Sequence, residues 1–118
     1  MDAPAQPPAG KSPVELEVGR LGGLQQAGRH AEALVGALVL QADLPENRDV
    51  LLLVATSQRC LGQLDAAMET LDRLERLYPR FSRLHQERGM AFVGRRDAPN
   101  AIQSLLISVN INPALPAS

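Results

Sequence analysis

Three prolines constrain the fold of this 118-residue chain because they recur at a fixed interval. Pro45, Pro79 and Pro113 lie 34 residues apart, and the same interval separates three alanines, Ala33, Ala67 and Ala101. A proline in a helix interior removes a backbone hydrogen bond and clashes with the preceding turn, so these positions mark helix ends. Periods of roughly 20 to 50 residues are typical of stacked repeat structures. The sequence therefore divides into three units, residues 14–47, 48–81 and 82–115.

Each unit contains apolar patterns for two helices joined by a short turn. In the second unit, residues 49–61 (DVLLLVATSQRCL) carry apolar side chains at the i, i+3, i+4 spacing of one helix face. Gly62 is expected to end this helix, because glycine accepts the left-handed conformation that follows many helices. Asp65 is expected to cap the next helix, which covers residues 66–78 (AAMETLDRLERLY). The third unit repeats the arrangement, with Pro99 at the start of its second helix.

The first helix of the chain has a strong start signal and a weak interior. Ser12 and Glu15 have the spacing of a capping box, and Pro13 suits the first helical position. Ser82 is expected to cap the corresponding helix of the third unit. The interior of the first helix contains three glycines, each costing about 0.5–1 kcal/mol relative to alanine: Gly19, Gly22 and Gly23.

Composition excludes several classes of protein. Hydrophobic residues make up 45% of the chain, which predicts a globular domain, and aromatic residues make up only 3%. The net charge of −1 favours neither a nucleic-acid nor a membrane partner. With one cysteine, Cys60, no internal disulfide or Cys-based zinc site can form.

The N-terminal residues lack the pattern of a signal peptide, so we expect a cytoplasmic protein. Residues 1–11 (MDAPAQPPAGK) are rich in proline and have no periodic apolar residue, which predicts a flexible tail. Residues 12–118 are then expected to form a single domain.

The 34-residue units resemble the tetratricopeptide repeat (TPR) family. The small residue at position 20 of that repeat matches Ala33, Ala67 and Ala101, and the proline at position 32 matches the three prolines. The large and aromatic positions depart from the family pattern. The resemblance covers residues 14–115 and implies an all-α fold, a right-handed α-solenoid of three antiparallel helix pairs.

The resemblance also implies a function, that of a protein–protein interaction module without catalysis of its own. In this family the first helix of each unit lines a concave groove that binds a peptide or protein partner. The groove positions correspond to Asp49, Leu52, Leu53, Thr56, Arg59, Arg83, Gln86, Glu87 and Met90. The other groove positions carry Glu15, Val18, Gly22, Gln25, Cys60 and Val93, and the mixed surface suits an extended or helical peptide.

One variant of the family binds the C-terminal carboxylates of chaperones through a clamp of basic and amide side chains. Of the corresponding positions here, only Arg83 carries a suitable charge, and Glu87 would repel a carboxylate. We therefore do not expect this chain to bind chaperone tails.

No pattern of residues predicts an enzyme, a metal site or a cofactor site. Cys60 has no histidine near it in sequence, and small thiols are commonly structural. His30 is expected in the turn of the first unit and His85 at a packing position of the third, without the spacing of metal ligands.

Two alternatives to the interaction module remain open. Residues 80–118 are similar to the N-terminal repeat region of bacterial TPR proteins that carry a sulfotransferase domain, which implies an accessory domain of a larger enzyme. The last helix, residues 101–111 (AIQSLLISVNI), is too apolar to bury on one side only, which indicates either a longer chain or a homo-oligomer formed through this helix.

Overall fold

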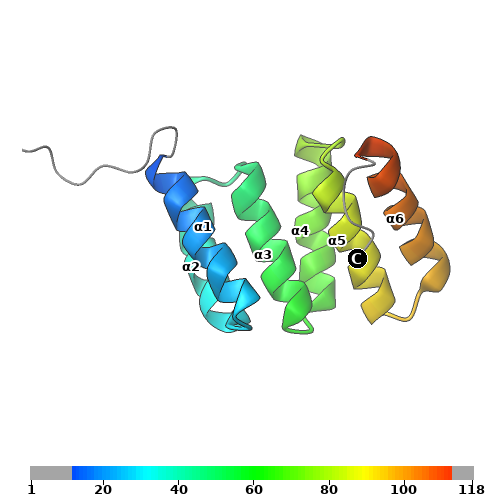
Figure 1. Cartoon of the computed structure of the whole chain (residues 1–118), viewed down its shortest axis with the longest axis horizontal. Helices are drawn as coiled ribbons and strands as arrows, with labels where there is room; N and C mark the ends of the chain where they lie inside the picture. Colours follow the sequence, from blue (N-terminus) through cyan, green and yellow to red (C-terminus); the bar gives the residue numbers. More distant parts are fainter. Residues whose placement is uncertain (1–11, 113–118) are drawn as a thin grey trace, which may run out of the picture.

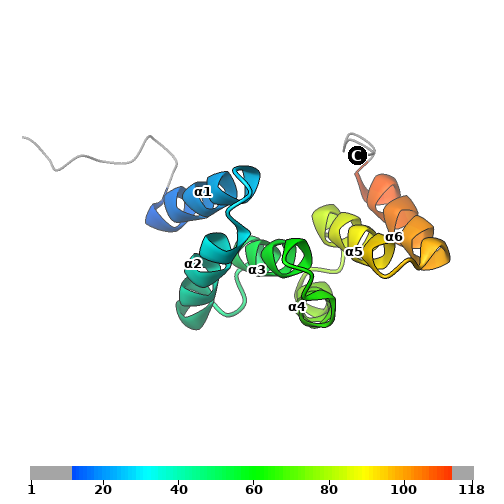
Figure 2. The ribbon, with the colours of Figure 1, turned by 90° about the horizontal axis from the view of Figure 1, so that it is seen from below.

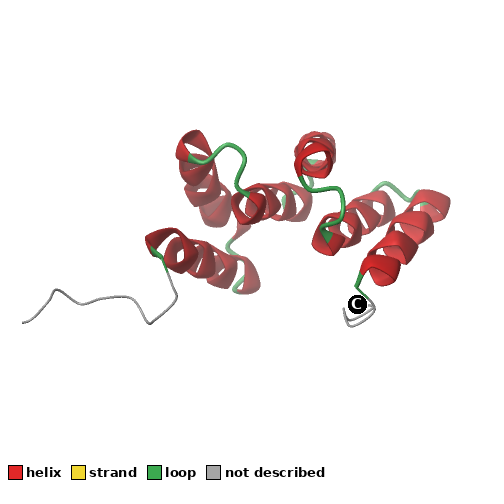
Figure 3. Ribbon diagram, turned by 90° about the horizontal axis from the view of Figure 1, so that it is seen from above, coloured by secondary structure: helices red, strands yellow, loops and turns green. Residues whose placement is uncertain are grey.

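The structure, a computed structural model, describes residues 12–112 as six α-helices without a β-strand (Figures 1 and 3). The predicted tail (residues 1–11), Pro113 and the other residues after Asn112 lie outside the described part. The all-α class is thus confirmed. The helices are α1 (Pro13–Gln26), α2 (His30–Asp43), α3 (Arg48–Cys60), α4 (Leu64–Leu77), α5 (Ser82–Gly94) and α6 (Ala98–Ile111).

The helices form three consecutive pairs, and their bounds recur at the interval seen in the sequence except at the start of α1, which comes one residue earlier. The second helices of the pairs begin at His30, Leu64 and Ala98, each 34 residues after the previous one. The turns inside the pairs, residues 27–29, 61–63 and 95–97, recur in the same way. Figures 1 and 2 show the pairs side by side in a row, with α3 and α4 in the middle.

The same backbone conformation occurs in all three turns. Gly28 and Gly62 both have φ of 80°, and Arg96 occupies the third equivalent position with φ of 61°. The predicted role of Gly62 after α3 is confirmed. Arg96 carries a steric cost of about 1–2 kcal/mol because its Cβ crowds the backbone in this left-handed region.

The predicted cap at Ser12 is confirmed, but two others are wrong. Ser12 Oγ accepts a hydrogen bond from Glu15 N, and Glu15 Oε1 accepts one from Ser12 N. Helix α4 begins one residue before Asp65, whose carboxylate instead pairs with Arg95 of the next pair. Ser82 lies inside α5, where it is buried and its carbonyl accepts a hydrogen bond from Ser108 Oγ at 3.0 Å.

Two helices are capped by residues that the sequence analysis did not identify. Asn47 Oδ1 accepts from the backbone N–H groups of Asp49 and Val50, both at 3.0 Å, and fixes the start of α3. Asp97 caps α6 through the N–H of Asn100.

Helix α3 lies at the centre of the hydrophobic core. On one side, Leu53 and Val54 form a buried cluster with Leu21 of α1 and Ala37 of α2. On the other side, α3 shares a second cluster with the later helices, made of Leu51, Ala55, Leu71, Leu74 and Leu84. The three alanines of the sequence period, Ala33, Ala67 and Ala101, are all buried.

The third pair packs closely because of a glycine. A Cβ atom placed on Gly89 of α5 would lie 2.7 Å from Leu105 Cγ and 3.3 Å from the Ala101 carbonyl oxygen, both on α6. Only a residue without a side chain fits in this contact. No helix in residues 12–112 has the length and apolar character needed to cross a membrane.

An exchange of residues between equivalent turns tests the cost of the left-handed conformation. Arg96→Gly should raise the free energy of unfolding by roughly 1 kcal/mol, because it removes the steric conflict at positive φ. Gly62→Arg should lower it by a similar amount, since nothing lies within 4 Å of a Cβ there and only the backbone is strained. Urea unfolding followed by circular dichroism measures both. Equal stability of the two variants would contradict this account.

The contact at Gly89 gives a second prediction. Gly89→Ala should lower the free energy of unfolding by about 1–3 kcal/mol, because the new methyl group overlaps Leu105 and meets the backbone of α6. Gly19→Ala is the matched control, since nothing lies within 4 Å of a Cβ at that helical position. It should raise stability by roughly 0.5–1 kcal/mol. Urea unfolding of both proteins gives the comparison, and a stabilised Gly89→Ala protein would refute the close approach.

Candidate functional site

A cavity of about 470 Å³ lies where α1, α2, α3 and α5 meet. Helix α3 supplies its central wall through a stripe of side chains at helical spacing, Asp49, Leu52, Leu53, Thr56 and Cys60. Helix α1 contributes Val18, Gly22, Gln25 and Gln26, while α2 and α5 contribute His30 and Arg83. We call this cavity the groove.

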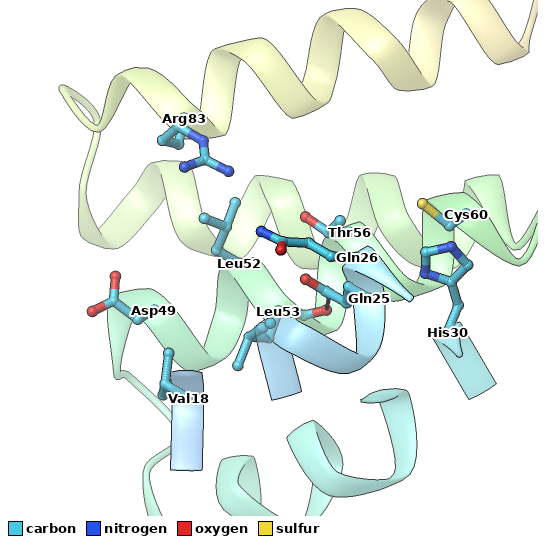
Figure 4. Close-up of a pocket in the computed structure, with 11 residues that line it drawn as sticks. Val18, Gln25, Gln26, His30, Asp49, Leu52, Leu53, Thr56, Cys60 and Arg83 are labelled. Atoms are coloured by element: carbon cyan, nitrogen blue, oxygen red, sulfur yellow. Dashed lines mark hydrogen bonds between the residues drawn. The ribbon is translucent and has the colours of Figure 1, made fainter. Parts of the chain in front are cut away.

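The groove has different chemistry along its length (Figure 4). Asp49 and Arg83 lie at one end, and His30 and Cys60 lie at the other. The leucines and the amide side chains of α1 lie between them. The Arg83 guanidinium has no ion-pair partner among residues 12–112, so its charge is available to a ligand.

Gln25 fixes the wall between α1 and α3. Its Nε2 atom donates to the Leu53 carbonyl oxygen at 3.1 Å and to Ser57 Oγ at 2.9 Å. Leu53 and Ser57 are themselves buried, so these bonds hold α1 against a rigid part of α3. These bonds therefore fix the side of the groove between α1 and α3.

The structure brings five of the nine expected groove residues together in the cavity. These are Asp49, Leu52, Leu53, Thr56 and Arg83. Leu53 also packs in the first core cluster, so only part of it faces the groove. The other four residues do not line this cavity: Arg59, Gln86, Glu87 and Met90.

Arg59 and Glu87 form an ion pair between α3 and α5. Arg59 Nε donates to Glu87 Oε1 at 2.7 Å, and the two side chains are 19% and 7% exposed. Glu87 therefore has a neutralising partner, and its charge is not directed at a ligand. The pair joins the second and third helix pairs.

Two cavity residues, Gln26 and His30, were not expected in the groove, whereas Cys60 was expected at a groove position. His30 begins α2 rather than lying in the turn, and its Nδ1 atom is buried without a hydrogen bond in the described part of the chain. Gln26 lies in the last turn of α1. Cys60 is exposed and lies near His30 (Figure 4). His30 is equivalent to Leu64, the first residue of α4.

Other ion pairs lie on the surface and are more exposed to water than the Arg59–Glu87 pair. On α1, Arg20 Nη2 lies 2.6 Å from Glu17 Oε2, and this hydrogen bond lowers the pKa of Glu17 while raising that of Arg20. A carboxyl group whose pKa is lowered in the folded chain stabilises the fold at pH values above its ordinary pKa. This stabilisation is lost as the pH falls through the lowered pKa. Because both side chains contact water, the effect is strongly screened.

Residues 12–112 contain no group of three or more His, Cys, Asp or Glu side chains that could hold a metal ion. The groove instead offers apolar contacts, amides and two charges at one end, which suits noncovalent binding. Neither a scan against protein-family models nor a search of curated proteins finds a match to the chain.

The Arg59–Glu87 pair allows a direct test of its structural role. Arg59→Met keeps the apolar stem but leaves Glu87 buried without its partner. Removing one partner of a completely buried ion pair lowers the free energy of unfolding by about 3–5 kcal/mol. We expect a loss of roughly 2 kcal/mol here, because Arg59 retains some contact with water. Arg29→Met, which removes an exposed pair with Glu32, is the control and should change stability by less than about 0.5 kcal/mol. Similar values for the two variants in urea unfolding would rule out a special role for the buried pair.

Proposed function

We propose that this chain is a TPR-type α-solenoid that binds a peptide segment of a protein partner in the groove. The observation that carries the proposal is the wall formed by one stripe of α3 between α1 and α5. The stripe combines leucines with polar side chains in a cavity whose walls are joined by hydrogen bonds. A preformed cavity of this kind binds with little loss of conformational entropy.

Three features support the assignment to the TPR class. The second helices of the pairs recur every 34 residues, the turns share a left-handed residue at one position, and small buried residues lie at the same point of each second helix. These features combine with the resemblance of the sequence to that family. The proposed solenoid places α1, α3 and α5 along the surface that binds the partner.

The groove suggests what the bound segment looks like. Leu52, with the exposed part of Leu53, provides contacts for an apolar side chain of the peptide. Gln26 and Thr56 offer hydrogen-bonding groups to a peptide backbone. One end of the groove holds Arg83 and, opposite in charge, Asp49, whose ion pair with Arg48 is exposed to water. These charges would orient a peptide that carries a charged side chain.

A peptide selected for binding provides the test. A phage-displayed random peptide library is selected on the wild-type protein, and the affinity of one selected peptide is measured by fluorescence anisotropy. Arg83→Glu and Thr56→Trp should each weaken binding at least about tenfold, because one reverses the groove's unpaired charge and the other fills the cavity. Thr56 is preferred over Leu53 because a bulky change at Leu53 would disturb the core.

The control is Arg76→Glu, a charge reversal on α4 at a separate surface depression. It should leave the affinity unchanged. Circular dichroism of each variant establishes that the protein is folded. Selected peptides that bind all of the variants as tightly as wild type would show that the groove is not the binding surface.

A further inference from the structure

Helix α6 differs from the other five described helices because it contains no charged residue. Its sequence from Ala98 to Ile111 is APNAIQSLLISVNI, whereas each of α1 to α5 contains at least two charged residues. Ile102 and Leu106 are each 58% exposed, and Val109 also faces solvent. These three side chains follow one another at i, i+4 and i+7, so they form one stripe along the helix, which we call the α6 stripe.

The recurring interval shows what this stripe corresponds to in the preceding pair. Ile102 is equivalent to Met68 of α4, which packs against the core cluster shared by α3, α4 and α5. Leu106 and Val109 are equivalent to Asp72 and Glu75, the two carboxylates that Arg88 of α5 contacts. In α4, therefore, this stripe is the face that meets the next helix pair. In α6 the same face is apolar, and no described helix covers it (Figure 2).

We infer that the α6 stripe binds the same stripe of a second copy of this chain, which gives a dimer with two-fold symmetry. An uncharged face loses no ionic hydration when it is buried, and two copies of it bring no like charges together. In a symmetric pair Leu106, at the middle of the stripe, contacts Leu106 of the other copy. This inference is independent of the proposed peptide groove, because α6 does not line the groove.

The other arrangement, in which α1 of a second copy continues the row, is disfavoured by charge. The residue of α1 equivalent to Arg88 is Arg20. In a continued row Arg20 would face Leu106 and Val109 in place of the two carboxylates that Arg88 contacts. Its guanidinium, which pairs with Glu17 on the same helix, would lose water without gaining a partner on α6.

The size of the stripe sets the expected affinity. Helix α6 has 14 residues and is therefore roughly 21 Å long. One such helix pair buries less than the approximately 1,600 Å² of a typical stable complex. We expect a dissociation constant on the order of 10 µM.

Sedimentation velocity of the 118-residue protein under reducing conditions, from about 1 to about 500 µM, tests the dimer across its expected dissociation constant. The mass should rise from 12.7 kDa to twice that value as the concentration increases. Leu106→Glu and Ile102→Glu should each weaken the dimer at least about tenfold, because each buries a charge at the interface. Val35→Glu is the matched control, since Val35 is a comparably exposed apolar residue on α2, and it should leave the dimer intact.

A cysteine cross-link distinguishes the symmetric dimer from a continued row. Leu106→Cys in a Cys60→Ser background should form a disulfide between identical positions of two chains on oxidation with glutathione disulfide. Val35→Cys in the same background should not. A monomer at every concentration, a mass that grows beyond the dimer, or loss of the dimer in Val35→Glu but not in Leu106→Glu would each overturn the inference.

Discussion

The burial of α3 on two opposite sides holds the three helix pairs together. Leu53 and Val54 pack toward the first pair, while Leu51 and Ala55 pack toward α4 and α5. A fully buried leucine or valine contributes about 1.5–3 kcal/mol, and α3 concentrates several of them in 13 residues. Because neither outer pair shares a buried cluster with the other, the fold depends on α3 for its continuity.

The position of the groove follows from the same burial. A helix with two buried sides retains one stripe for solvent, and on α3 this stripe runs through Asp49, Leu52, Thr56 and Cys60. The neighbouring first helices α1 and α5 flank the stripe. The surface available for binding is therefore fixed by the packing of the core, and Gln25 reinforces it by bonding to the buried part of α3.

The sequence predicted the features that depend on local backbone chemistry. Prolines and glycines at a 34-residue interval located the helix ends, because they act through φ angles and missing hydrogen bonds within a few residues. The caps were harder to predict. Asp65 and Ser82 are good capping residues by type, but α4 begins at Leu64 and α5 begins with Ser82 already inside the helix. A residue can cap a helix only if the helix begins at the next residue. The 34-residue period does not determine at which residue a helix begins.

The site was predictable where it lies on one helix and unpredictable where it depends on the relative placement of helices. The stripe of α3 follows from helical spacing alone. The pairing of Arg59 with Glu87, 28 residues apart, depends on how α5 lies against α3, which the spacing of residues along one helix does not determine. His30 joins the groove for a similar reason, because the first turn of α2 lies beside the last turn of α3 (Figure 4).

The two junctions between helix pairs use different chemistry, and this difference bears on how the row of pairs ends. At the junction between the first and second pairs, Val54 packs in an apolar cluster. At the junction between the second and third pairs, the equivalent residue is Arg88, which contacts two carboxylates. At the start of the row the equivalent residue is Arg20, and at its end the facing surface is the uncharged α6. These two ends do not complement each other, so the mismatch opposes open-ended stacking of copies, which heterologous contacts otherwise permit. Differences among equivalent residues thus decide which surfaces of two copies of a repetitive fold can meet.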